Sequence, residues 1–381
     1  MSDVKITRIE TIVLRRPMRI HAGEVGWLWV RLYTDQGLVG LGETYPTAES
    51  SEAVIRHQLA PLLLGRDPRQ IDRLWADMKL STESFGATGA EMRAISAVDL
   101  ALWDLLGKYT GQPVYQLLGG KSRDRIRTYN TCYDHRHDFR TDAAGLARSL
   151  LDEGVNAMKI WPFDEIAVAN HGQFITHAEM EEGLRPLREI REAVGDEMEV
   201  AMEFHGYWNL PSAVRIARAL EPYEPMWLEE MLPQDNLASY QALRDQTSIP
   251  LILSERLMTR WQFREVLEQG LAHVVNPDIS WCGGLSEAKK IATFAETYHV
   301  PIAPHNCGGP VLHVASLHLA QNAPNLLMLE SVRRHYQQDY LGLVTETGAA
   351  EHGWLRAPER PGLGIELDPA VLSRADVRIT G

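Results

Sequence analysis

The order of hydrophobic and polar positions divides the chain into two unlike stretches. Apolar and polar residues alternate over 4–14, 27–33 and 38–43, and Gly37 stands at the turn before the third run. Alternation with a period of two predicts half-buried strands, and the glycine turn predicts an antiparallel meander. Apolar residues then recur at helical spacing until Gly111, a residue typical of helix ends. Three strands followed by helices predict an α+β domain.

Residues 15–26, between the first two predicted strands, contain turn residues and charges without any regular period. We interpret this segment either as a mobile flap or as an ordinary surface loop. If it is a flap, His21 is a candidate substrate contact. Tyr45, just after the third strand, is another candidate of the same kind.

From Arg125 onward, short apolar runs alternate with longer amphipathic stretches such as 212–220. This α/β alternation predicts parallel strands with crossover helices, and eight such units close a TIM barrel. We therefore expect a capping domain at 1–124, a barrel at 125–350 and a segment at 351–381 that returns to the cap.

Successive apolar runs of the predicted barrel end in reactive side chains. A doubly wound open sheet would instead gather its ligands at one crevice, so the pattern favours a barrel with a catalytic face at its strand ends. The residues at these ends are Lys159, Glu203, His205, Glu229, Glu255, Asp278, His305 and Glu330.

Composition and charge narrow the range of possible binding partners. The chain has 381 residues, 45% of them hydrophobic and 23% charged, with a formal net charge of -13. Acid excess without a basic stripe argues against nucleic acid, and no apolar run reaches the ~20 residues of a membrane span. The N-terminus lacks the features of a signal peptide, so we expect a cytoplasmic protein. The three cysteines have no C-x-x-C spacing, which argues against a disulfide framework or a zinc cluster.

The strand ends also carry a family resemblance. The stretches 203–206 (EFHG), 254–256 (SER), 276–280 (NPDIS) and 283–287 (GGLSE), behind an α+β domain that ends in Leu-Leu-Gly-Gly, resemble the mandelate racemase branch of the enolase superfamily. Within that branch they are similar to galactonate dehydratases. The resemblance implies an N-terminal cap and a modified (β/α)7β TIM barrel. It also implies one Mg²⁺ per subunit, an acid sugar as substrate and a homo-oligomer, either a dimer or an octamer.

Three acids of this set suit a divalent cation. Glu203, Glu229 and Glu255 end successive strands, and three carboxylates form the oxygen-rich site that Mg²⁺ prefers. A single acid of this kind would more often cap a helix or face solvent. Glu230, next to Glu229, is expected to point away from the site and to orient the ligands.

The resemblance implies roles for the other members. His305, supported by Asp278, would remove the proton α to the substrate carboxylate, since enolase-superfamily sites use a Lys or His base with Mg²⁺. His205 would protonate the departing hydroxyl, or else cap the following helix or orient Glu203. Lys159 would neutralise the carboxylate or the enediolate oxygen, and Glu330 could donate a hydrogen bond there if protonated.

At one position the sequence departs from the pattern of the family, and this position indicates which reaction the protein catalyses. Racemases of this branch carry a second lysine two residues after the first, and here that position is Trp161. A single base with an acid suits dehydration of an aldonate or aldarate to a 2-keto-3-deoxy acid. An epimerase or cycloisomerase, or a non-catalytic homologue, remains open. Trp161 and Arg256 are candidate substrate contacts, with barrel packing as the other interpretation.

Overall fold

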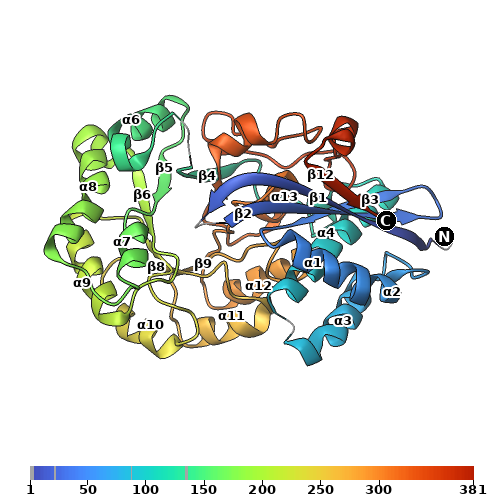
Figure 1. The fold of residues 1–381 in the computed structure, drawn as a ribbon, viewed down its shortest axis with the longest axis horizontal. Helices are drawn as coiled ribbons and strands as arrows, with labels where there is room; N and C mark the ends of the chain where they lie inside the picture. Colours follow the sequence, from blue (N-terminus) through green and yellow to red (C-terminus); the bar gives the residue numbers. More distant parts are fainter. Residues whose placement is uncertain (1–3, 21–22, 87, 134–135) are drawn as a thin grey trace.

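The structure is a computed structural model that describes residues 4–20, 23–86, 88–133 and 136–381. It contains an antiparallel sheet with its helices and, beside it, a ring of parallel strands surrounded by helices (Figure 1). The C-terminus lies at the end of the molecule formed by the antiparallel sheet (Figure 1). The predicted fold class, an α/β chain with an α+β cap and a modified TIM barrel, is confirmed.

The antiparallel sheet has the order β12-β1-β2-β3. Its strands are β1 (Ile6–Ile20), β2 (Gly23–Thr34), β3 (Val39–Thr44) and, from the other end of the chain, β12 (Val377–Thr380). Because β12 pairs with β1, the last residues of the chain belong to the same sheet as the first.

The interpretation of 15–26 as an ordinary surface loop is wrong for the residues that the structure describes, whereas its interpretation as a flap stays a prediction. The β1 and β2 backbones stay paired from Arg15 and Gly26 to Ile20 and Gly23. The register shifts between Arg16 and Arg19, where β1 has two more residues than β2.

The described residues of the cap form five α-helices, which are α1 (Ala48–Val54), α2 (Ala60–Leu63), α3 (Ile71–Thr82), α4 (Ala90–Thr110) and α5 (Val114–Leu117). Of these, α4 and α1 pack against this sheet. Helix α4 approaches β3 so closely that a Cβ atom at Gly42 would lie 1.9 Å from the carbonyl oxygen of Ala97. Glycine on the strand and alanine on the helix are therefore required for this contact. Gly111 ends α4 with a φ of 69°, as its sequence position predicts.

The parallel strands run in the order β10-β4-β5-β6-β7-β8-β9. Their bounds are β4 (Ile126–Thr131), β5 (Ala157–Ile160), β6 (Glu199–Glu203), β7 (Leu228–Glu229), β8 (Leu251–Leu253), β9 (Val274–Val275) and β10 (Leu329–Ser331). Single bridges from Val275 to Ile302 and from Ile302 to Leu326 connect β9 with the chain that leads into β10. The apolar run at 300–304, which ends in His305, joins the sheet through these two bridges, both at Ile302.

The outer layer consists of helices that follow the strands along the chain. They are α6 (Phe139–Asp152), α7 (Asp164–Ala169), α8 (His177–Val194), α9 (Leu210–Leu220), α10 (Leu237–Arg244), α11 (Thr259–Glu268), α12 (Gly284–Thr297) and α13 (Pro310–Asn322). Among the helices of the described ranges, none is both long enough and apolar enough to cross a membrane.

Each of the eight segments that form the barrel wall contributes one apolar side chain to the interior, below the charged residues at the strand ends. The cluster consists of Tyr129, Ala157, Ala201, Trp227, Ile252, Val274, Ala303 and Met328. Tyr129 and Trp227 meet edge to face with their centroids 5.1 Å apart, beside three alanines that leave room for them. This apolar cluster excludes water from the interior of the barrel and supports the charged residues at the strand ends.

The C-terminal residues contact both parts of the molecule. Strand β11 (Trp354–Leu355) pairs with β4 of the barrel, whereas β12 pairs with β1 of the cap. We propose 1–124, 125–350 and 351–381 as the limits of the cap, the barrel and the returning segment.

Candidate functional site

Three carboxylates meet at the carboxyl ends of neighbouring strands. Glu203 is the last residue of β6 and pairs in register with Glu229, the last residue of β7. Glu255 follows β8 by two residues. One oxygen of each lies within 4.8 Å of the others, and the three residues are at most 4% exposed. We call this set the carboxylate triad.

The triad holds more negative charge than its neighbours balance. The ammonium of Lys159 lies 3.2 Å from Glu203 Oε2 and 2.9 Å from Glu229 Oε1. Burial and the adjacent Glu203 raise the pKa of Glu229 well above its ordinary value, and burial likewise raises the pKa of Glu255. Burial also acts on Glu203, but His205 and Lys159 outweigh it and lower the pKa of that carboxyl. The triad therefore favours an additional cation.

The donors of the triad fit Mg²⁺. All three are carboxylate oxygens, and Glu255 Oε2 is buried without a hydrogen-bond partner in the described part of the chain. Glu229 is held by Asn276 Nδ2, which donates to Oε1 at 2.7 Å, and by Trp227 Nε1, which donates to Oε2 at 3.2 Å. An oriented, oxygen-only set with an unpaired buried oxygen is a site for a hard divalent cation.

His305 lies on one side of the triad. Its Nδ1 is 2.8 Å from Asp278 Oδ2, and its Nε2 is 3.6 Å from Glu255 Oε2. Asp278 is itself fixed, because Ser280 donates to Oδ1 through its amide and its hydroxyl, both at 2.7 Å. Burial opposes a charge on the imidazole, but Glu255 and Glu330 raise the pKa of His305 well above its ordinary value.

A second histidine and aspartate pair lies near the triad. His205 Nδ1 is 2.6 Å from Asp164 Oδ2, and the His205 amide donates to Glu203 Oε1 at 2.7 Å. His205 lies beyond the strand, because β6 ends at Glu203 and His205 stands in the following turn with a φ of 51°. Burial opposes protonation, but Glu203 and Asp164 outweigh it and raise the pKa of His205.

Lys159, on β5, and Glu330, on β10, form an ion pair in the same site. Lys159 Nζ is 2.9 Å from Glu330 Oε1, Thr131 donates to the same oxygen, and the Asn306 amide donates to Oε2 at 2.7 Å. Burial alone would raise the pKa of Glu330, but Lys159 and His305 lower it to about 2. The protonated form that Glu330 would need in order to donate a hydrogen bond is disfavoured by these neighbours, from which the carboxylate accepts.

The expected substrate contacts occupy different positions. Trp161 is half-buried, with its ring 6.3 Å from that of His205 and edge-on to Phe139 at 5.0 Å. Arg256 is ion-paired with Glu230 and lies 3.6 Å from Glu255 Oε1. Tyr45 is buried and donates its hydroxyl to Asp278 Oδ2 at 3.1 Å. His21 lies outside the described residues.

Sequence reasoning missed three residues of this region. Asp164, at the start of α7, comes four residues after the end of β5, and acids soon after a strand are the available signal. Asn276 directly follows β9, and Cys307 stands two residues beyond His305. An amide and an isolated thiol lack a distinctive sequence pattern, so only the folded chain relates them to the triad.

A hollow of about 500 Å³ lies elsewhere, between Arg125 and Glu359. Its lining includes Trp354, which pairs with Arg127 at the amino end of β4. The hollow is therefore at the end of the barrel opposite the triad, and none of the site residues described above lines it.

An antiparallel cap beside a parallel barrel, with acids and histidines at the strand ends, defines an enzyme of the enolase type. Residues 3–119 match the family model for the N-terminal domain of mandelate racemase / muconate lactonizing enzyme. Residues 142–371 match the model for the enolase C-terminal domain-like region. The chain belongs to the mandelate racemase / muconate lactonizing enzyme family, and the resemblance in the sequence is confirmed.

Individual relatives are similar over nearly the whole chain. The chain is 36% identical to a D-galactonate dehydratase of Ralstonia nicotianae, over 97% of this chain and 94% of the relative. It is 35% identical to a D-galactonate dehydratase of Variovorax paradoxus, over 92% and 91%. The crystal structure of an enolase of the mandelate racemase subgroup from Agrobacterium tumefaciens matches with a TM-score of 0.89 and 45% identity, over 99% and 98%.

Proposed function

We propose that this protein is a hydro-lyase that dehydrates an acid sugar, an aldonate or aldarate, to its 2-keto-3-deoxy acid. One observation carries the proposal. His305 and His205, on either side of the carboxylate triad, each have Nδ1 held by an aspartate, at 2.8 and 2.6 Å. Elimination of water needs one group to take a proton and another to give one, and two oriented imidazoles supply both.

The relatives support this choice of reaction and substrate class. Two of them are named D-galactonate dehydratases, and each matches more than 90% of this chain. Because their names concern those proteins, galactonate is here the first candidate within the broader class of acid sugars. A polyhydroxylated carboxylate also suits a site that combines a cation site with several hydrogen-bonding side chains.

In the proposed reaction, His305 Nε2 removes the proton from C2, next to the substrate carboxylate. Asp278 accepts from Nδ1, so Nε2 is the atom that takes the proton, and a cation held by the triad would offset the charge of Glu255 that favours the imidazolium form of His305. The C2 electrons delocalise into the carboxylate as an enediolate, whose charge the ammonium of Lys159 stabilises from within the site. Glu330 keeps Lys159 charged and in place through their 2.9 Å contact.

His205 then gives a proton to the hydroxyl that leaves C3. The C3–O bond breaks, water departs, and the enediolate electrons form the C2–C3 double bond of an enol. The enol tautomerises to the 2-keto-3-deoxy acid. Asp164 and Glu203 keep the imidazolium form of His205 available, since both raise the pKa of His205.

We propose one Mg²⁺ per subunit, held by Glu203, Glu229 and Glu255. When bound, the ion would neutralise the substrate carboxylate and so make the C2 proton more acidic. Asn276 and Trp227 would keep Glu229 in its ligating position. Trp161 and Arg256 are the proposed substrate contacts, because one flanks His205 and the other lies next to Glu255.

A panel of acid sugars tests the proposal. Purified protein with Mg²⁺ is incubated with galactonate and with other aldonates and aldarates, and 2-keto acid is measured as its semicarbazone. Formation of keto acid from at least one member supports dehydration. If every member is inert, proton NMR in D₂O separates the alternatives. Exchange at C2 without keto acid favours an epimerase, whereas absence of exchange contradicts catalysis of this type.

A further inference from the structure

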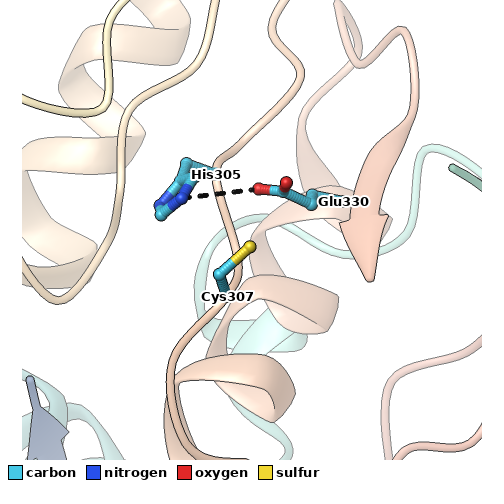
Figure 2. Close-up of side chains that lie close together, drawn as sticks. All are labelled: His305, Cys307 and Glu330. Carbon is cyan, nitrogen blue, oxygen red and sulfur yellow. Dashed lines mark ion pairs between the residues drawn. The ribbon is translucent and has the colours of Figure 1, made fainter. Parts of the chain in front are cut away.

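Cys307 is a side chain in the site that the proposed dehydration does not use. It is half-buried and stands two residues beyond His305, and Glu330 comes from β10 on the other side (Figure 2). One ligand atom from each of these three residues lies within 4.8 Å of the others. An imidazole nitrogen, a thiol sulfur and a carboxylate oxygen thus converge on one point.

The donors of this set differ from those of the carboxylate triad. The triad offers three oxygens and suits a hard cation, whereas nitrogen, sulfur and oxygen together suit Zn²⁺ or Co²⁺. The two sets share no residue, so a different cation can be held by each. They are also adjacent, because His305 Nε2 is 3.6 Å from Glu255 Oε2.

The histidine of the set is already oriented as a metal ligand. Asp278 holds Nδ1 at 2.8 Å, which leaves Nε2 facing Glu330 Oε2 at 3.8 Å. A carboxylate on the far nitrogen of a ligating histidine is a recurrent feature of zinc sites. The Asn306 amide fixes Glu330 Oε2 at 2.7 Å, so the carboxylate ligand is oriented as well.

We propose that His305, Cys307 and Glu330 form a second cation site, specific for thiophilic divalent ions such as Zn²⁺. Binding breaks the S–H bond of Cys307 and releases that proton to solvent, while the sulfur and the Nε2 lone pair form bonds to the cation. No electron is transferred. The occupied site engages the nitrogen that would accept the C2 proton, so Zn²⁺ inhibits the enzyme. Only this inhibitory consequence rests on the proposed function.

Cobalt is the probe for binding itself. Protein freed of metal with a chelator is saturated with Mg²⁺ and then titrated with Co²⁺. We expect a thiolate-to-cobalt charge-transfer band in the near ultraviolet that saturates at one equivalent. The band should be absent in Cys307→Ser and retained in Cys282→Ser, the control, whose buried thiol lies outside the cluster. A wild-type protein without the band, or a Cys307→Ser variant that keeps it, overturns the proposal.

The inhibitory consequence is measured with Mg²⁺ in excess, each variant being normalised to its own rate without Zn²⁺. Loss of one ligand should raise the inhibitory Zn²⁺ concentration by about 10–100-fold in Cys307→Ser. Equal inhibition of both proteins would mean that Zn²⁺ acts at the carboxylate triad, and would overturn the proposal. Cys307→Ala serves as a second variant, and thermal unfolding verifies that each is folded. A protein that dehydrates no acid sugar leaves the cobalt result decisive, so the two proposals fail separately.

Discussion

Buried acids occur in two regions of this protein, and they are stabilised in different ways. The first region is the seam, where Glu43, Asp99 and Asp104 of the cap meet the barrel and the returning segment. The second is the mouth of the barrel, which contains the carboxylate triad, Glu330 and Lys159.

Each acid of the seam has its own donors. Glu43 accepts from Trp29 Nε1 at 2.8 Å and from the first amides of α13 at 3.1 and 3.2 Å. Asp99 accepts from the amide and the hydroxyl of Ser286, at 3.0 and 2.6 Å. These donors join the cap to helices of the barrel, so the seam acids hold the two parts in a fixed relation.

The acids of the mouth face one another instead. Lys159 is shared by Glu203, Glu229 and Glu330, and one oxygen of Glu255 has no hydrogen-bond partner within the described ranges. Such crowding destabilises the folded state and persists where it serves a ligand. Burial alone therefore does not identify a functional acid. Several buried acids that converge without enough hydrogen-bond donors do identify a functional site. Neutralising an acid should therefore have opposite consequences in the two regions.

The largest effect is expected for Glu255→Gln in the mouth. Loss of one charge from the triad should lower the dehydration rate by about 10²–10³-fold, the size found when one preorganised electrostatic group is removed. The unfolding midpoint should not fall, because the substitution relieves repulsion. Steady-state kinetics and thermal unfolding measure both, with the exposed Glu268→Gln on α11 as control. A large loss of stability would show that Glu255 belongs with the seam acids.

His205→Asn should lower the dehydration rate by about 10²-fold, the lower range for loss of a general acid. Exchange of the C2 proton with D₂O should continue, because His305 and the triad are intact. Comparison of keto acid formation with exchange by NMR measures the difference. If exchange and dehydration fall together, the side chain of His205 orients Glu203 instead of giving the proton.

Asp104→Asn in the seam should destabilise the protein and leave the rate unchanged. Asp104 accepts from the amides of Leu41 and Leu363 on separate oxygens, each at 2.8 Å, and from Lys108. An asparagine would point its NH₂ group at one of these amides, a loss of roughly 1–3 kcal/mol. Denaturant unfolding measures the change. An equal loss of activity per folded molecule would contradict the separation of the two regions.

The last effect concerns the pH dependence of stability and not the rate. Burial raises the pKa of Asp99 from 3.8 to about 7, against the donors of Ser286. Since the folded-state pKa lies above the unfolded-state pKa, the folded protein keeps a proton that the unfolded chain releases, and this group's contribution to stability decreases as pH rises between about 4 and 7. The slope is at most about 1.4 kcal/mol per pH unit for one proton.

Asp99→Asn should remove that part of the slope. Asparagine can accept from the Ser286 amide and donate to its hydroxyl, so both contacts of the aspartate can be kept. Unfolding midpoints at a series of pH values measure the change. An unchanged slope would mean that Asp99 is ionised in the folded protein.

Much of the fold and site could be predicted because the pattern repeats. Parallel strands that end in Glu203, Glu229 and Glu255 must bring those ends to the same edge of the sheet, whatever the details of packing. The extension of β1 and β2 could not be predicted, because residues 15–26 lack the apolar-polar alternation that identifies a strand. Nor could the sequence predict that the run at 300–304 pairs only through Ile302, because an apolar run does not reveal how many of its residues pair.

The sequence by itself determined the order of cap and barrel, the three carboxylates and the pairing of Asp278 with His305, since each follows from where a strand ends. The tertiary structure decided what depends on contacts between distant segments. Examples are Asp164 beside His205, the shared Lys159 that leaves Glu330 ionised, and the approach of Cys307 to Glu330. Charge state and donor identity depend on the atoms within a few ångströms, and only the closed barrel specifies those atoms.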